Sequence, residues 1–408
     1  MRKIAYWSSL ILIFLVPWED SISTENMGSL ARLMGMALAG LWLATIVIEG
    51  KFRKPHLFHV LVLAFFLWNF VSVFWTADIE NTMQRIKTYI QIFLLTLIYW
   101  DIFQKQNDLN AGFQAYVFGA YVLIISTVYN YLLGNVAVKY EGRYSATGVN
   151  ANDVALILVL GLPIAVHLFF AASRSTVGII LRLINLLYVP LSIYSIVLTG
   201  SRTPLIAIIP FGIFLLGAQQ IKVERKLLVL MILLACLLVL FPFIPPSVIQ
   251  RLGTTGESIG EGDLGGRLRL WGEAIAVLNQ HVILGVGSGA ITSKIGSAVH
   301  NTFISIAAET GVIGLLLFCS IAGIAVYQAM RLPKATSRLW LAMIMTWVIG
   351  VSSLSWEFRK LTWIILSFVV LEGNSGASPE EQNASSVPSE VVGSSHQQIG
   401  PESQIKVM

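Results

Sequence analysis

Long apolar runs separated by short polar connections make up most of this chain. Many of the runs approach 20 residues, the length of helix that crosses the hydrocarbon core of a bilayer. The pattern therefore predicts about twelve membrane-spanning helices. Their expected bounds are Ile4–Trp18, Leu30–Ile48, His56–Trp75, Ile86–Phe103, Leu109–Leu133, Val154–Ala172, Val177–Leu198, Pro204–Ala218, Leu227–Phe243, Thr302–Met330, Leu339–Leu354 and Leu361–Leu371. The first run is expected to stay uncleaved, because no small-x-small cleavage site follows it.

Composition supports the same fold class. Of the 408 residues, 56% are hydrophobic and 12% are charged, whereas a soluble domain has about 25% charged residues. We therefore expect an all-α polytopic membrane protein. Both cysteines, Cys236 and Cys319, lie inside apolar runs, which excludes a disulfide framework and a cysteine metal site. The net charge of +5 is small, and nucleic acid is not an expected partner.

The distribution of charge predicts the orientation in the membrane. If the N-terminus is cytoplasmic, the Lys- and Arg-rich connections fall inside and the acidic connections around Glu19 and Asp78 fall outside. Six arginines then lie on the outer side against this bias, and an anionic ligand at the outer membrane face is the simplest reason for them. Lipid headgroups are the alternative for two of them, Arg251 and Arg359. The six are Arg143, Arg202, Arg251, Arg267, Arg269 and Arg359.

Two outer connections are unusually long, residues 134–153 and 244–301, and they belong to a membrane domain expected over residues 1–372. The second is a large loop within which Arg267–Gln280 reads as an amphipathic helix. Its apolar face is formed by Leu270, Ala274, Val277 and Leu278. Irregular backbone is expected at Gly285, Gly287 and Gly289. Residues 373–408 are rich in Ser, Gly, Glu and Gln and are predicted to form a disordered cytoplasmic tail.

Arg202 precedes a helix that has Pro204 in its first turn and Ser201 or Thr203 as the expected N-cap. The helix dipole slightly disfavours a cation at that end, and a bound anion would relieve the conflict. A side chain that snorkels to the interface is the alternative.

Arg267 and Arg269 stand two residues apart on the amphipathic helix and cannot both point at one ligand. Arg267 is the preferred ligand residue, whereas Arg269 has Glu273 four residues on and could form an ion pair. Trp271 is a candidate for packing, for a sugar platform or for an interfacial anchor.

His300 stands at the entry of a membrane helix with Asn301 or Thr302 as the expected N-cap. This placement lowers the pKa of an imidazole and leaves it able to accept a proton. Glu309 lies about two turns further along, in a polar stripe with Thr302 and Ser305. An ionisable group at that depth indicates either function or a structural pairing with an outer arginine.

Near residue 150 the roles are mostly structural. Asn152 or Asp153 is the expected cap of the helix that follows, Arg143 adds a positive group, and Tyr140 and Tyr144 could stack on a sugar. The sequence contains no phosphate-binding loop, no dinucleotide glycine pattern and no His/Cys metal spacing. The nearest outer approach to an Asp-x-Asp pair is Glu261-Gly262-Asp263. We therefore expect a site without a metal or other cofactor.

Together these motifs resemble a known family. The Asn-rich entry at 150–153, Ser201-Arg202, Gly266-Arg267 with Trp271, the glycines of 284–289, and His300-Asn301 with Glu309-Thr310-Gly311 occur in one order. The combination looks like the O-antigen ligase and polymerase superfamily of bacterial envelope enzymes, closely so from Gly142 to Gly314. The short connection after the eleventh predicted span departs from that pattern, because it holds no further acceptor-binding loop.

The resemblance implies a glycosyltransferase of the bacterial cytoplasmic (inner) membrane whose active site faces the periplasm. It would pass a glycan from undecaprenyl diphosphate to a hydroxyl of lipid A-core or of a growing glycan, with inversion at the anomeric carbon. By position, Arg202 and Arg267 would hold the diphosphate, and His300 would lie at the acceptor hydroxyl. From the residues themselves, Arg269 and Arg143 are further candidates for binding the diphosphate, and Glu309 is a second catalytic candidate. A repeat-unit polymerase, a protein O-oligosaccharyltransferase and a transporter are the alternatives, in that order.

Overall fold

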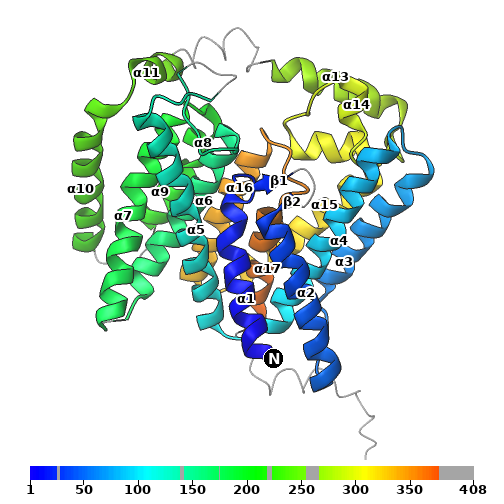
Figure 1. Ribbon diagram of the computed structural model, residues 1–408, viewed down its shortest axis with the longest axis horizontal. Helices are drawn as coiled ribbons and strands as arrows, with labels where there is room; N and C mark the ends of the chain where they lie inside the picture. Colours follow the sequence, from blue (N-terminus) through cyan, green and yellow to red (C-terminus); the bar gives the residue numbers. More distant parts are fainter. Residues whose placement is uncertain (25–27, 138–141, 174, 218–222, 254–265, 376–408) are drawn as a thin grey trace, which may run out of the picture. The chain divides into compact units, whose positions relative to one another are not determined.

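The computed structural model describes residues 1–24, 28–137, 142–173, 175–217, 223–253 and 266–375. These residues are almost entirely helical, apart from one two-residue strand pair, β1 (Ser23–Thr24) with β2 (Gly28–Ser29). Figure 1 shows the helices and labels them. From residue 376 onward, the predicted tail lies outside the described residues. Tyr140, Glu261 and Asp263, which belong to other segments, also lie outside them.

The helices follow one another in this order: α1 (Arg2–Leu15), η1 (Val16–Trp18), α2 (Leu30–Glu49), α3 (Leu57–Val71), η2 (Ser72–Phe74), α4 (Ile79–Ile102), α5 (Gln106–Leu132), α6 (Ala151–Ala171), α7 (Thr176–Leu198), α8 (Arg202–Ala207), α9 (Ile209–Gly217), α10 (Val223–Leu240), η3 (Phe241–Phe243), α11 (Pro246–Gly253), α13 (Arg267–Gln280), α14 (Ile291–Ile295), α15 (Thr302–Arg331), α16 (Lys334–Val351) and α17 (Lys360–Ser375).

Over its described residues, each apolar run predicted to span the membrane coincides with one or more helices. Six helices among the described residues are long and apolar enough to cross a bilayer: Leu30–Glu49, Leu57–Phe74, Gln106–Leu132, Ala151–Ala171, Thr176–Leu198 and Thr302–Arg331. About twelve spans therefore stay a prediction. The run expected at Pro204–Ala218 is divided into α8 and α9, and α4 begins at Ile79 rather than at Ile86. Helix α17 continues to Ser375, past the expected start of the tail at Gly373, and the tail itself stays a prediction.

Capping side chains fix the helix starts that matter for the site. Asn150, not Asn152 or Asp153, caps α6, because its side chain accepts the backbone N–H of Asn152. Asn301 caps α15 and accepts the N–H groups of Phe303 and Ile304, as one of the two predicted alternatives. Ser201 precedes α8, but its side chain makes no cap hydrogen bond there.

The core is centred on α6, which is buried over most of its length between α5, α7, α8 and α16. A glycine makes the closest of these contacts possible. A Cβ on Gly161 would lie 2.1 Å from the hydroxyl of Tyr188, and that hydroxyl donates to the carbonyl of Leu158 at 3.0 Å. The α6–α7 pair therefore forms a rigid support for the turn that follows α7.

The connections between helices contact other connections that are predicted to lie on the same side of the membrane. On the predicted inner side, Arg2 pairs with Asp101, and Gln106 donates to Glu372. On the predicted outer side, Arg359 pairs with Asp20, and Ser293 donates to Asp78. Figure 1 shows α13 and α14 at the end of the bundle opposite the start of α1. The two sets of connections thus occupy opposite ends, as the charge distribution predicts, and α13 lies at the predicted outer end.

The amphipathic helix α13 has the bounds that the sequence predicts, and its face packs on a small core of its own. Leu270 and Ala274 are buried, as expected for that face. The buried members of this core are Ala274, Val286, Ala290, Ile291, Val299 and Ala308, with Trp271, Val277, Ile295 and Ile304 packed around them. We call this group the α13 core.

Helix α15 is broken at Gly311, where φ is +67° and ψ is −171°, a backbone conformation that only glycine adopts readily. The break lets the glycine-rich loop dock along the helix. Val286 and Gly287 donate their N–H groups to the carbonyls of Ala308 and Glu309 at 3.0 and 2.8 Å. The backbone at Gly285, Gly287 and Gly289 has positive φ, which confirms the expected irregularity.

Candidate functional site

The turn between α7 and α8, residues 199–203, is the centre of the candidate site. Gly200 has φ +57°, and a Cβ added there would lie 3.2 Å from Cδ of Arg251 and 3.4 Å from Cγ of Arg143. Two arginine side chains therefore pack directly against this turn. Both belong to the six arginines that the sequence singles out on the outer side.

Arg143 supports the turn through hydrogen bonds from a buried side chain. Its side chain is 3% exposed, its Nε donates to the Thr199 carbonyl at 2.7 Å, and its Nη2 donates to Oδ1 of Asn152 at 2.9 Å. The same oxygen of Asn152 accepts the hydroxyl of Ser201 at 2.6 Å. The Asn-rich entry of α6 is thus tied to the Ser201-Arg202 motif by shared hydrogen bonds, and Arg143 contributes its charge from a buried position.

Arg202 and Arg251 are linked to each other and to the turn. Nη2 of Arg202 donates to the backbone carbonyl of Arg251 at 3.2 Å, and Nε of Arg251 donates to the carbonyl of Gly200 at 3.2 Å. Arg251 is one of the two residues with lipid headgroups as an alternative, and the contacts that the structure shows for it are with Arg202 and this turn. Arg202 is half-buried, so its guanidinium is held rather than spread across the interface.

Arg267 reaches the same turn from α13, a separate part of the chain. Its Nη1 donates to the hydroxyl of Thr203, the residue after Arg202, at 3.3 Å. The structure therefore places Arg267 at the turn that carries Arg202, and these are the two arginines predicted to act on one ligand. We call Arg143, Arg202, Arg251 and Arg267 the arginine cluster. The side chains of all four contact the turn at residues 199–203 or one another's backbone.

The remaining two outer arginines lie elsewhere. Arg269 has a side chain that is 70% exposed and pairs with Glu273 at 2.6 Å, the alternative that the spacing suggested. Arg359 pairs with Asp20 at 2.6 Å and with Asp153 at 3.1 Å. The partners that the structure shows for Arg359 are thus acidic side chains of the protein itself.

His300 is held between two anchored neighbours. On one side, the indole N–H of Trp271 donates to the carbonyl of Val299 at 3.1 Å. On the other, Asn301 caps α15 and donates to the carbonyl of Ser352 at 3.0 Å. The φ angle of His300 is +55°, the single positive value at a non-glycine position among the described residues. Trp271 thus has the packing role among its three alternatives, and it couples His300 to the helix that carries Arg267.

The electrostatics of His300 agree with the expected direction. Burial lowers the pKa of its imidazole below the usual 6.5, and the nearby charge of Arg267 lowers it further, while Asp153 opposes both. The predicted cause was the helix terminus, whereas burial is the largest cause. A neutral imidazole near the arginine cluster is able to accept a proton at neutral pH.

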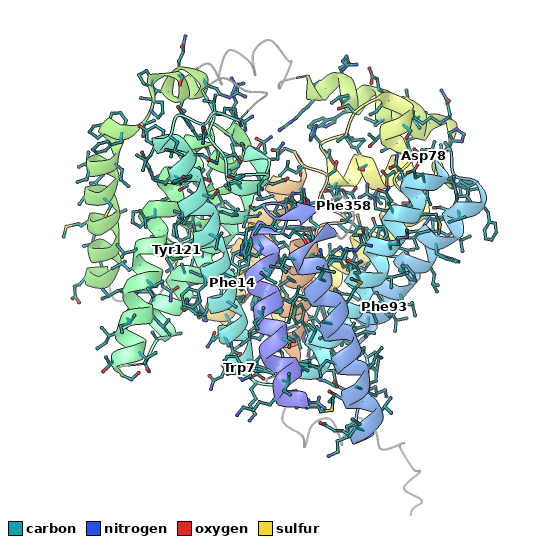
Figure 2. The ribbon with its side chains drawn as sticks, viewed as in Figure 1. Trp7, Phe14, Asp78, Phe93, Tyr121 and Phe358 are labelled. Atoms are coloured by element: carbon teal, nitrogen blue, oxygen red, sulfur yellow. The ribbon has the colours of Figure 1, made fainter. Side chains whose placement is uncertain are left out.

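Glu309 lies in a different, buried cluster. Its side chain is 2% exposed, and Oε1 lies 3.9 Å from Nη2 of Arg85. The other nitrogen of Arg85 lies 3.6 Å from Oε1 of Glu357, which accepts the hydroxyl of Ser305 at 3.2 Å. The guanidinium also stacks on the ring of Phe358 at 3.8 Å; Figure 2 labels this ring. The polar stripe of α15 therefore faces the protein interior, as predicted.

Arg85 and Glu357 are the site residues that sequence reasoning missed. Arg85 belongs to the predicted outer connection before the fourth span, so the argument that selected six arginines against the charge bias applies equally to it. Glu357 carried no comparable signal, because it stands in a short connection without a motif. Pairing with an arginine was one of the alternatives for Glu309, and the structure supplies Arg85 as that partner.

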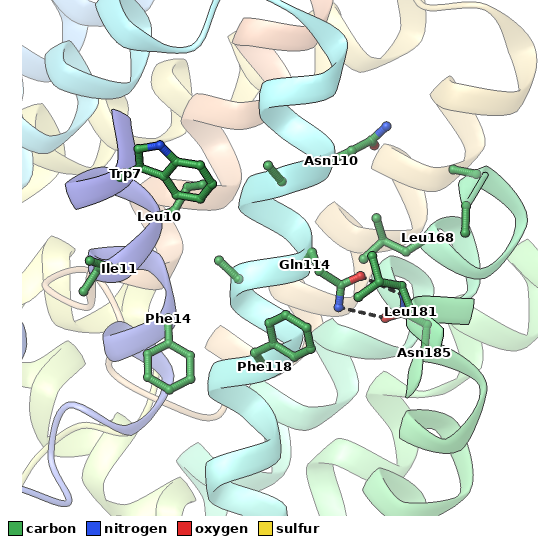
Figure 3. Close-up of a pocket in the computed structure, with 14 residues that line it drawn as sticks. Trp7, Leu10, Ile11, Phe14, Asn110, Gln114, Phe118, Leu168, Leu181 and Asn185 are labelled. Atoms are coloured by element: carbon green, nitrogen blue, oxygen red, sulfur yellow. Dashed lines mark hydrogen bonds between the residues drawn. The ribbon is translucent and has the colours of Figure 1, made fainter. Parts of the chain in front are cut away.

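A sizeable cavity lies away from these groups. It measures about 630 Å³ and is bounded by α1, α5, α6 and α7. Its walls are apolar except for three amide side chains, two of which bond to each other, Asn185 donating to Gln114 at 2.8 Å (Figure 3). No titratable side chain lines it, so it offers no acid or base.

In the part of the chain that the structure describes, no set of three or more His, Cys, Asp or Glu residues is placed to hold a metal ion. Metal independence stays a prediction, because the residues around Glu261 and Asp263 lie outside the described ranges.

A family model described as O-antigen ligase matches residues 187–319. Over these residues the chain is similar to the O-antigen ligase family. The match includes Arg202, Arg267, Arg269, His300 and Glu309, and it ends before Glu357. It does not include Arg143, although the sequence resemblance was placed from Gly142 onward. No curated protein matches the chain.

The O-antigen ligase match supports a glycan-handling function of the ligase or polymerase kind, with a lipid-linked glycan and a glycan acceptor as the general partners. Together with the apolar helices of spanning length, it indicates a multi-pass membrane protein.

Proposed function

We propose that this protein transfers a glycan from undecaprenyl diphosphate to an acceptor sugar hydroxyl at the periplasmic face of the bacterial cytoplasmic membrane, as an O-antigen ligase. The observation that carries the proposal is the hydrogen bond from Arg267 to Thr203 beside Arg202. It places Arg267, from a distant part of the chain, at the turn that carries Arg202, within the O-antigen ligase match.

The chemistry of the leaving group explains the need for cations. When the glycosyl bond breaks, negative charge develops on the departing diphosphate, and fixed guanidinium groups stabilise that charge without having to reorganise. Arg202 and Arg267 supply this stabilisation, and each can bind phosphate oxygens through a planar fork. Arg143 and Arg251 hold the turn in place through Thr199 and Gly200.

The acceptor hydroxyl is a weak nucleophile and gains from a base. His300 is the proposed base, because burial and Arg267 keep its imidazole neutral. Glu309 is enclosed with Arg85 and Glu357, so we propose that it positions α15, and through α15 the entry at His300, rather than accepting the proton. Direct attack opposite the diphosphate would invert the anomeric carbon.

The proposal is tested by transfer assays with purified protein and lipid-linked donor. Arg202→Ala and Arg267→Ala should each lower turnover by about 100-fold or more, the cost of removing a donor to developing negative charge. Arg269→Ala is the matched control and should retain activity, because this arginine pairs with Glu273 on the surface. Full activity in either cluster variant, with normal insertion, would overturn the assignment.

A second variant tests the base. His300→Asn keeps a residue that tolerates positive φ, so the loss of the imidazole is separated from backbone strain. Turnover should fall by about 10²–10⁴-fold, and donor binding should change little. Unchanged activity in the presence of a chelator is the expected result for metal independence.

Analysis of the reaction product distinguishes the two closest candidate activities, ligase and repeat-unit polymerase. Transfer to lipid A-core supports the ligase, whereas lengthened lipid-linked chains would indicate a repeat-unit polymerase. Both outcomes retain the same roles for the arginine cluster and His300.

A further inference from the structure

A second groove, separate from the arginine cluster, lies between α1, α2 and α4, and Lys360 at the start of α17 also lines it. Its volume is about 270 Å³, and apolar side chains form most of its surface. We call it the α2–α4 trough. Its lining residues with a direct bearing on binding are Arg32, Gly35, Ala39, Lys87, Leu94 and Lys360.

The floor of the trough is built from regular helix faces. On α2, Arg32, Gly35, Met36 and Ala39 follow one another at helical spacing, and the two smallest of them open the space. An added Cβ at Gly35 would meet only Leu12 Cδ2, at 3.9 Å, so this position faces room rather than a packed neighbour. The trough therefore has a long apolar floor suited to a flexible hydrocarbon chain.

Three cations border the trough. Arg32 is in the first turn of α2, Lys360 begins α17, and Lys87 is two turns into α4. Lys360 pairs with Glu19. Among the residues that the structure describes, no acidic side chain forms an ion pair with Arg32 or Lys87, and Lys87 is exposed. Arg32 and Lys87 are thus two cations without an acidic partner among the described residues, and both border an apolar groove.

The surroundings of the trough face the bilayer. The outward side of α2 exposes a row of apolar side chains, among them Leu33, Met36 and Leu43, and α2 is one of the helices apolar and long enough to span a membrane. In Figure 1, α1 and α2 lie beside each other, and their ends at the β1–β2 pair lie on the same side as α13. The cations stand at that end, near the level expected for lipid headgroups.

We propose that the α2–α4 trough binds an anionic phospholipid of the bilayer, with one acyl chain along the Gly35–Ala39 floor and its phosphate at Arg32 and Lys87. The charges match a phosphate, and the floor matches a hydrocarbon chain. A soluble phosphate would leave the floor uncovered, and a partner helix, about 10–12 Å across, is too wide for a groove of this volume. None of the four residues of the arginine cluster lines the trough.

The test measures lipid retention by native mass spectrometry of the purified full-length protein in detergent. Phosphatidylglycerol and phosphatidylcholine with identical chains are compared at equal mole fraction. The wild-type protein should retain phosphatidylglycerol preferentially. Arg32→Ala and Lys87→Ala should each weaken this retention about fivefold, because one cation near a membrane surface contributes about 1 kcal/mol toward an anionic lipid.

A steric variant tests the floor separately from the charges. Gly35→Leu should fill the trough and abolish the preference, whereas Gly40→Leu, on the same helix with open space around it, should leave it intact. Arg202→Ala should also leave it intact, which separates this site from the proposed catalytic one. Equal retention of the two lipids, or wild-type retention in both Arg32→Ala and Gly35→Leu, would overturn the proposal. So would stronger retention of undecaprenyl phosphate than of phosphatidylglycerol, since the occupant would then be a carrier lipid.

Discussion

At the scale of single residues, the decisive feature is that arginines with the same predicted side of the membrane have different environments. Four surround the turn at residues 199–203, Arg269 pairs on the surface, and Arg359 is neutralised by Asp20 and Asp153. The charge bias identified a group of candidates, but it contains no information on the partners that each side chain meets after folding.

The pH dependence of transfer should report the environment of His300. Burial and Arg267 lower its pKa, so the neutral form persists below pH 6.5 and activity should fall only in more acidic solution. Asp153 raises that pKa, so Asp153→Asn should move the acidic limb of the turnover profile to still lower pH. Asp20→Asn is the control, because Asp20 also pairs with Arg359 but does not contribute to the shift at His300. An acidic limb that moves upward in Asp153→Asn would contradict His300 as the base.

The buried cluster of Arg85, Glu309 and Glu357 should respond to substitution as one unit. Arg85→Leu leaves two buried carboxylates without their cation and should destabilise the fold by about 3–5 kcal/mol. The triple variant that adds Glu309→Gln and Glu357→Gln should recover much of that loss, since no buried charge remains. Thermal unfolding in detergent measures both. Equal stability of Arg85→Leu and the wild type would show that the ion pairs contribute nothing to the fold.

At the scale of elements, the sequence predicted helices well because a membrane helix is specified by its own apolar run. The amphipathic helix Arg267–Gln280 was predicted with its observed bounds, since its apolar spacing is regular and Gly266 precedes it. Short elements were missed: α11 and α14 are eight and five residues long and have no distinct pattern. The division of α8 from α9 was also missed, because an apolar run looks continuous across a helix break.

The broken helix α15 provides a test at this scale. Gly311→Ala forces a side chain into a conformation that only glycine favours, and its Cβ would lie 2.0 Å from the carbonyl oxygen of Ile283. The docked loop should detach, with a loss of about 2 kcal/mol or more and of transfer activity. Gly323→Ala lies in the same helix with nothing within 4 Å and should be neutral or slightly stabilising. Thermal unfolding distinguishes the two, and equal midpoints would contradict the role of the break.

At the scale of the whole molecule, the sequence predicted which connections gather at each end, because charge distribution and helix order determine the sides together. It could not predict that Arg85 of α4 pairs with Glu309 of α15 and with Glu357 of the connection at residues 352–359. Those contacts depend on packing between helices that are far apart in sequence. The number of helices that cross the bilayer also stays open to experiment.

Orientation is testable by cysteine labelling of whole cells in a background of Cys236→Ser and Cys319→Ser. Thr292→Cys, exposed on α14, should react with a membrane-impermeant maleimide from outside. Lys51→Cys, exposed at the opposite end, should react only after the cells are permeabilised. The reverse pattern would invert the predicted topology and remove the periplasmic assignment of the site.

The α13 core has a consequence for how specificity can change. Arg267 and His300 are both attached to it, the first through α13 and the second through Val299 and Trp271, whereas Arg202 belongs to the helix bundle. A substitution in this small core would shift the proposed phosphate-binding arginine and the proposed base together relative to Arg202. The space left for sugars could thus be adjusted at positions that touch no substrate, while the spacing between those two side chains is preserved.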